Sequence, residues 1–168
     1  MPYDFGDRPR PPFVGDEREV LDGWLDFHRA TLLMKCEGLT LEQLKVRPLR
    51  TSTLSLLGLV RHLTEVERGW FLPFLGEPVT ELYCTEADPD GDFRGVPHAD
   101  AEADLARYGA TVDSISDLLR RHRLDEVEED GGTSYNMRWI LTHMIEEYAR
   151  HNGHADLLRE AVDGTRGE

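Results

Sequence analysis

Residues 139–158 read WILTHMIEEYARHNGHADLL, and this stretch decides the fold. Its apolar residues recur at steps of three and four, which predicts a helix with one buried face. Along that face lie Ile140, Met144, Glu147, His151, Ala155, Leu158 and Val162. A carboxylate and an imidazole therefore stand in the middle of an apolar stripe, where burying them is unfavourable unless a partner satisfies both groups.

Two arrangements would satisfy Glu147 and His151. A divalent metal can be chelated by two side chains four residues apart on one helix. A buried hydrogen-bonded glutamate–histidine pair explains the same pattern without a metal, so a third ligand from another helix is needed to favour the metal. His143 and His154 lie one turn to either side and are reserve ligands.

The bulk composition predicts one domain. The chain has 168 residues, of which 39% are hydrophobic, and this is enough to build one core of ordinary size. We expect a single domain over residues 1–168, in which the Pro- and Gly-rich residues 1–15 form an N-terminal arm.

Charge and sequence patterning exclude several classes of partner. A formal net charge of -14 repels phosphate backbones, so nucleic acid is not expected to bind. No apolar run approaches the roughly 18 residues of a membrane span, and no signal-peptide pattern opens the chain. With no export signal, Cys36 and Cys84 are expected to be free thiols in a reducing cytoplasm.

Four long helices are predicted from the apolar periodicity. They are expected at residues 17–37, 53–73, 100–122 and from Ser134, as a cap, to Gly164. No segment alternates convincingly as a strand, and the acidic residues 126–132 are expected to form a solvated connection. The predicted fold class is therefore all-α, a four-helix bundle.

Capping signals mark the expected helix starts. Capping boxes begin at Asp16 and at Thr40, the second opening a short helix before the second long one. Ser52 or Thr53 is expected to cap the helix at 53–73.

An irregular loop is expected at residues 75–99, between the second and third long helices. A loop this long in a compact domain is often functional, so we expect it to shape the substrate entrance. Its DPDGD run, residues 88–92, begins like a calcium-binding loop but lacks the glycine and the glutamate that such loops need at positions six and twelve. We expect these residues to form a solvated turn.

His62 is the candidate third ligand. It lies on the second long helix with small neighbours, and bundles build metal sites from residues on facing helices. A distance of more than about 8 Å between Glu147 and His62 would exclude a shared metal, because bonds near 2 Å hold ligand atoms within about 4 Å of one another. Glu65, one turn after His62, can orient it or face water.

Two stretches carry a resemblance to a known family. They are LLGLVRHLTEVERGWF at residues 56–71 and RWILTHMIEEYARHNGH at residues 138–154. With them the chain resembles, from about residue 17 to 163, the DinB-like (YfiT-like) superfamily, in a branch common in actinobacteria.

The resemblance implies a four-helix bundle, often a homodimer, that binds a divalent metal, zinc or nickel in many members. The usual ligands are one histidine on the second helix and two histidines four apart on the last. His62 and His151 match this pattern, whereas Glu147 replaces a histidine and is similar to the His/Glu/His set of mycothiol-dependent maleylpyruvate isomerase. Glu65, His143 and His154 then support the ligands or replace one.

The resemblance also implies a function. Several relatives use a small-molecule thiol, such as mycothiol, as a cosubstrate in S-transfer to an electrophilic substrate or in isomerisation. We therefore expect a metal-dependent thiol S-transferase or isomerase. A metal-bound water is a hydroxide source near neutral pH, so a metal-dependent hydrolase is an alternative, and a non-catalytic module that binds metal or a small molecule is another.

Overall fold

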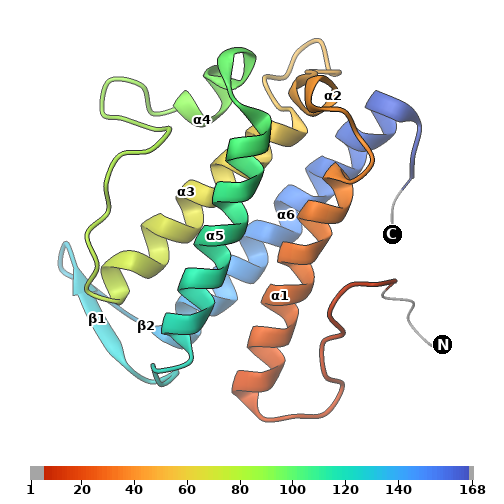
Figure 1. Ribbon diagram of the computed structural model, residues 1–168. Coiled ribbons are helices and arrows are strands. Elements are labelled where there is room, and N and C mark those ends of the chain that lie inside the picture. Colours follow the sequence, from red (N-terminus) through yellow and green to blue (C-terminus); the bar gives the residue numbers. More distant parts are fainter. Residues whose placement is uncertain (1–5, 167–168) are drawn as a thin grey trace.

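Four long helices form the bundle that the sequence predicts (Figure 1). The computed structural model describes residues 6–166, apart from the side chain of Asp130. The long helices are α1 (Glu17–Cys36), α3 (Leu56–Phe74), α5 (Ala101–Leu119) and α6 (Met137–Asp163). Between them lie the short helices α2 (Leu41–Lys45) and α4 (Gly91–Arg94), the 3-10 turn η1 (Val96–His98), and the strands β1 (Val127–Asp130) and β2 (Thr133–Asn136).

The direction of the helices explains the long loop. In Figure 1, α1 and α6 run upward while α3 and α5 both run downward, with α1 and α5 in front. Two consecutive helices that run in the same direction need a connection along the whole bundle. A helix of 19 residues, such as α3, is about 28 Å long at 1.5 Å per residue. Residues 75–100 cover this distance, and the expectation of an irregular loop between the second and third long helices is confirmed.

The helix starts follow the capping signals with two corrections. Capping boxes begin at Asp16 and Thr40, as predicted. The cap of α3 is Ser55, whose hydroxyl accepts the N–H of Gly58 at 3.0 Å. Ser52, the earlier candidate, instead accepts the N–H of Leu54 within the preceding turn. Thr53, the other candidate, likewise lies outside the helix.

A β-hairpin precedes α6, where the sequence predicts no strand. Strands β1 and β2 pair antiparallel, with Glu129 opposite Ser134, so Ser134 lies in a strand and Asn136 caps α6. The turn consists of Gly131 and Gly132, with φ of 57° and 82°. Both angles are positive, which favours glycine and suits the twist of a two-residue hairpin turn.

The core encloses a charged pair as well as apolar side chains. Arg29 of α1 donates to both carboxylate oxygens of Glu67 of α3 at 2.7 Å, and Glu67 is fully buried. The hydroxyl of Tyr148 donates to Glu67 at 2.8 Å and lies 3.0 Å from the hydroxyl of Tyr108. Burial, and then the Glu67 charge, raise the pKa of Tyr148, so its hydroxyl stays protonated and remains a donor.

The described part of the N-terminal arm lies along α1. Residues 1–5 of the expected arm are outside the described residues, but Arg8 donates to the Thr31 hydroxyl at 3.1 Å and covers the Phe27 ring at 4.5 Å. Both cysteines are free thiols, as predicted, and burial raises the pKa of Cys36 to about 12.

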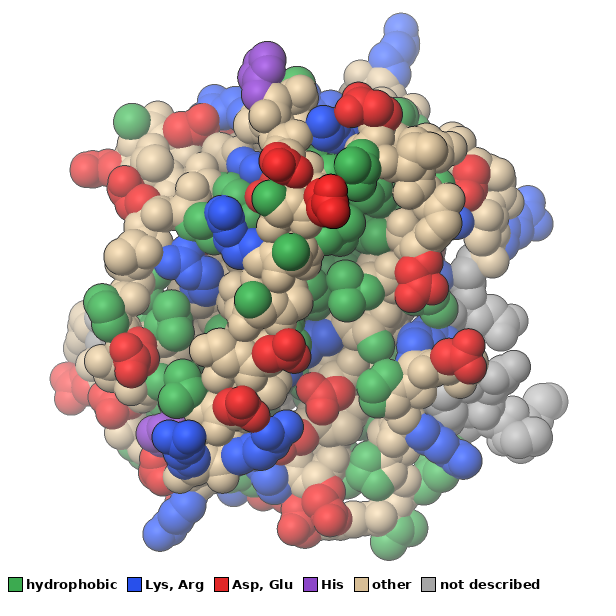
Figure 2. Space-filling view, viewed as in Figure 1, with side chains coloured by type: hydrophobic (Ala, Val, Ile, Leu, Met, Phe, Trp, Pro, Cys, Tyr) green, Lys and Arg blue, Asp and Glu red, His purple; other side chains and the backbone are tan. Residues whose placement is uncertain are grey.

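Charged side chains of both signs are scattered over the face formed by α1 and α5 (Figure 2). No helix within residues 6–166 combines the length and the apolar content needed to cross a membrane.

Candidate metal centre

One row of side chains on α6 organises the site. Trp139, His143, Glu147 and His151 follow one another at steps of four residues, and neighbours at this spacing lie on adjacent turns of a helix. Helix α6 begins directly before this row, because the Asn136 side chain accepts the N–H of Trp139 at 2.9 Å. The row faces α3, on which His62 and Trp70 contact its two ends.

His62 of α3 converges with Glu147 and His151 of α6. The rings of His62 and His151 lie 4.7 Å apart between centroids, and Nε2 of His151 is 3.3 Å from Oε2 of Glu147. Each of the three residues offers a nitrogen or oxygen within 4.8 Å of those of the other two. This spacing is well inside the distance of about 8 Å that would exclude a shared metal, and their side chains are 13–27% exposed, so an ion can reach them.

His151 is held in the form that binds metals. Burial, and then the neighbouring His62, lower its pKa to about 4. Its imidazole is therefore neutral at physiological pH, and only the neutral ring has a lone pair to donate to a metal.

Asp92 completes the surroundings of His62 and was not among the candidates. Its Oδ2 lies 2.8 Å from Nδ1 of His62, which leaves Nε2 as the ring nitrogen for a ligand. Carboxylates commonly orient metal-binding histidines in this way. The expectation of a solvated turn at residues 88–92 is wrong for Asp92, which is 3% exposed, because the loop folds back and presses this side chain against α3.

Side chains of α3 fasten the loop that carries Asp92. The carboxylate of Glu65 accepts the backbone N–H groups of Tyr83 and Cys84 at 2.6 and 2.9 Å, so it binds the loop rather than His62. The buried guanidinium of Arg61 donates to the backbone carbonyl of Asp92 at 2.7 Å. These contacts fix the position from which Asp92 reaches His62.

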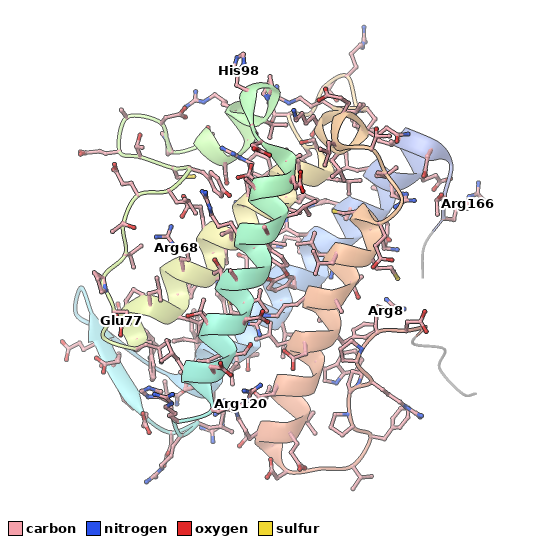
Figure 3. All side chains as sticks on the ribbon, in the orientation of Figure 1. Arg8, Arg68, Glu77, His98, Arg120 and Arg166 are labelled. Carbon is pink, nitrogen blue, oxygen red and sulfur yellow. The ribbon has the colours of Figure 1, made fainter. Side chains whose placement is uncertain are left out.

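The outer half of the loop is held in the same manner. In Figure 3 it rises from Glu77 past Arg68, which donates to the carbonyl and the hydroxyl of Thr80 at 2.8 and 2.9 Å. Further along, the ring of Phe93 stacks on His62 with centroids 5.3 Å apart. The loop therefore forms one wall beside His62 through Asp92 and Phe93.

The two reserve histidines lie at opposite edges of the cluster. Nε2 of His143 is 3.8 Å from Oε1 of Glu147, and with Glu146 the pair forms a second group that could hold an ion. Glu146, however, is exposed and paired with Arg150. His154 approaches only the far side of His151, with their Nδ1 atoms 3.4 Å apart.

The donor set fits a divalent metal. Two imidazoles and one carboxylate are the ligands of many catalytic zinc sites, in which three protein ligands leave a further position open. Here they come from two facing helices, and an aspartate supports one of them. Without a metal, Glu147 and His151 can form the hydrogen-bonded glutamate–histidine pair that is the alternative in the sequence. Elemental analysis for bound metal distinguishes a metal site from such a pair.

Comparison with known protein families gives one finding. The family model described as Mycothiol-S-transferase matches residues 20–164, from early in α1 to the end of α6. This range includes every residue of the cluster. No curated protein matches the chain.

Proposed function

The chain belongs to the mycothiol S-transferase family, and we propose that it transfers mycothiol sulfur to an electrophile at a divalent-metal centre. The proposed ligands are His62, Glu147 and His151. The family match confirms the resemblance to the DinB-like superfamily, and it favours S-transfer over the hydrolase and the non-catalytic module.

The convergence of the three candidate ligands carries the proposal. His62 precedes Glu147 by 85 residues, yet the donor atoms of all three residues lie within 4.8 Å of one another. A divalent metal bound there would hold the thiol as its thiolate, which is the reactive nucleophile. Zinc or nickel is the metal that the resemblance favours.

The protein's own residues prepare this site for a thiol. Asp92 orients the ring of His62, and the low pKa of His151 keeps it neutral. Phe93 covers the His62 ring and keeps water from one side of it. In the transfer itself, the thiolate sulfur forms a bond to the electrophilic carbon, and the leaving group departs with the electron pair of the bond that breaks.

Elemental analysis of untagged protein, beside His151→Ala, is the first test. About one zinc or nickel per chain in the wild type and a loss in the variant would support the metal centre. Thioether formation from mycothiol and an electrophile, monitored with and without a chelator, then tests the transfer. Glutathione in place of mycothiol is the matched control for the thiol.

Each alternative has its own outcome. Turnover that needs metal but no thiol would indicate a hydrolase, and bound metal without turnover would indicate a binding module. Protein that stays metal-free after reconstitution would leave Glu147 and His151 as a structural pair and overturn the proposal.

We further propose a single domain over residues 1–168, a homodimer and a cytoplasmic location, all expected from the sequence and its resemblance. Light scattering coupled to size exclusion, with 19.2 kDa as the mass of one chain, tests the dimer.

A further inference from the structure

An aromatic hollow lies beside the N-terminal end of the row on α6 that carries the candidate metal ligands Glu147 and His151. Trp70 of α3, Tyr135 of β2 and Trp139 of α6 form its walls around a cavity of about 520 Å3. Pro73, Thr133 and Ser134 also line it. A cavity of this volume is in the range of small-molecule sites, and Figure 1 places the hairpin beside the end of α3 and the start of α6, where these walls meet.

The three rings present a broad apolar surface. Trp70 lies 5.2 Å from Trp139 and 6.2 Å from Tyr135, centroid to centroid, and the rings are tilted by 52° and 83°. Trp139 remains 49% exposed, although tryptophan is among the side chains with most to gain from burial. A flat apolar group resting on this ring would cover it.

His143 connects the hollow to the metal cluster. Its ring stacks on Trp139 at 5.1 Å and 14°, and it lies 4.6 Å from the ring of Trp70. On its other side, Nε2 is 3.8 Å from Glu147. Because Trp139 precedes Glu147 by eight residues, the two positions are about 12 Å apart along α6.

We propose that this hollow binds a planar aromatic group of the electrophilic substrate, whose reacting carbon reaches past His143 toward the thiol. The inference rests on the proposed function and adds the substrate class: an elongated electrophile with an aromatic end. The hollow sets which electrophile is used, and the metal cluster sets the thiol chemistry.

The lining favours an aromatic group over the sugar of the thiol. The described side chains around the hollow carry no charge or amide, and only Thr133, Ser134 and Tyr135 offer hydroxyls. A sugar would lose many hydrogen bonds to water and regain few here, whereas a flat apolar ring needs none.

Two variants test the hollow, one by removing an aromatic wall and the other by filling the space. Trp139→Leu removes the stacking surface, and the exposed Trp24 of α1 provides the matched control Trp24→Leu. Gly69→Leu adds a side chain to the lining where nothing lies within 4 Å of a new Cβ, so α3 should fold normally. Gly109→Leu on α5 is its control, because that helical glycine has the same free space.

Binding is measured first, with protein kept metal-free by a chelator. The probe is 2-naphthylmethanol, with cyclohexylmethanol as its non-planar counterpart, in ligand-observed NMR titrations. We expect the naphthyl probe to bind more tightly than the cyclohexyl one, and Trp139→Leu to weaken it about tenfold, the size of one lost aromatic contact. Gly69→Leu should abolish binding, while both controls keep it.

Kinetics with metal and mycothiol then locate the bound group. Trp139→Leu should raise KM for a naphthyl electrophile about tenfold more than it raises KM for a small aliphatic electrophile or KM for mycothiol. A raised KM for mycothiol with both electrophiles would assign the hollow to the sugar and overturn the inference.

The binding test separates this inference from the proposed function. Equal binding of both probes, or naphthyl binding that neither variant weakens, would refute the aromatic site even in an active transferase. Selective naphthyl binding that Trp139→Leu weakens and Gly69→Leu removes would support the site even if mycothiol were not the thiol.

Discussion

Two glutamates on neighbouring helices of this bundle have opposite surroundings. Glu67 of α3 is fully buried and accepts two hydrogen bonds from Arg29 and one from Tyr148. Glu147 of α6 is 19% exposed and lies beside the rings of His143 and His151, at 3.8 and 3.3 Å, with a ring nitrogen of His62 within 4.8 Å. The protein's own donors saturate the first carboxylate, whereas the second is surrounded by groups that bind metals. The comparison separates a carboxylate that stabilises the fold from one that is available to a ligand.

Glu67→Gln gives the largest expected effect. The substitution removes the buried counter-charge of Arg29 and leaves the exposed Asp26, at 3.3 Å, as its acidic partner. We expect the free energy of unfolding to fall by about 3–5 kcal/mol. Urea denaturation measures it. The control is Glu17→Gln, which breaks an exposed pair with Arg138 and should have no measurable effect. Equal stability of Glu67→Gln and Glu17→Gln would show that the Arg29–Glu67 pair does not stabilise the fold.

Glu147→Gln should change the response to metal rather than the fold. A metal at about 100 times its Kd stabilises the native state by about 2.7 kcal/mol, so the wild type should melt at a higher temperature with zinc or nickel than with a chelator. The variant should lose most of this shift. Glu146→Gln, on the adjacent exposed residue, should keep it. An undiminished rise of the melting temperature with metal in Glu147→Gln would show that Glu147 is not a ligand.

Asp92→Asn tests the hydrogen bond that orients His62, and not a proposed metal ligand. Without the carboxylate on Nδ1, the His62 ring is less well oriented, and such changes weaken metal binding about 10- to 100-fold. Competition with a chromogenic chelator gives the affinity. Asp90→Asn, on an exposed aspartate of the same loop, should leave it unchanged. Equal affinities in all three proteins would show that the His62–Asp92 bond does not support metal binding.

Acid should lower the stability of the metal-free protein through His151. The pKa of His151 is about 4 in the folded protein against 6.5 as its ordinary value, so the unfolded state binds more protons between these values. Metal-free protein should therefore lose stability as pH falls from about 6.5 toward 4. His151→Gln should lose less between pH 7 and pH 5, as measured by urea midpoints. An identical loss in both proteins would assign the acid sensitivity to other groups.

The helices of this fold are predictable from the sequence because burial follows a 3.6-residue period over long stretches. The hairpin is not predictable in this way. Its strands, VEED and TSYN, have four residues each and no apolar alternation. The pair Gly131-Gly132 was the available signal, since two glycines favour a tight hairpin turn, but the surrounding acidic residues obscured it.

The sequence predicts the site residues that lie on the long helices, but not the one that lies in the loop. His62, Glu147 and His151 stand out because polar groups interrupt apolar stripes. Asp92 does not stand out, since its burial depends on Arg61 and Glu65 of α3 fastening the loop, a tertiary effect that no local pattern records. For the same reason, the partner of Glu65 is the loop backbone and not the neighbouring histidine.

The hairpin before α6 contributes to the aromatic hollow and not to the candidate metal cluster. Its tip at Gly131-Gly132 is exposed, while its second strand supplies Thr133, Ser134 and Tyr135 to the aromatic hollow. None of the proposed metal ligands His62, Glu147 and His151 comes from this segment. A hairpin of another length or sequence would therefore change the proposed substrate hollow without changing the proposed metal ligands. This connection is a suitable place to vary substrate preference, by design or in evolution.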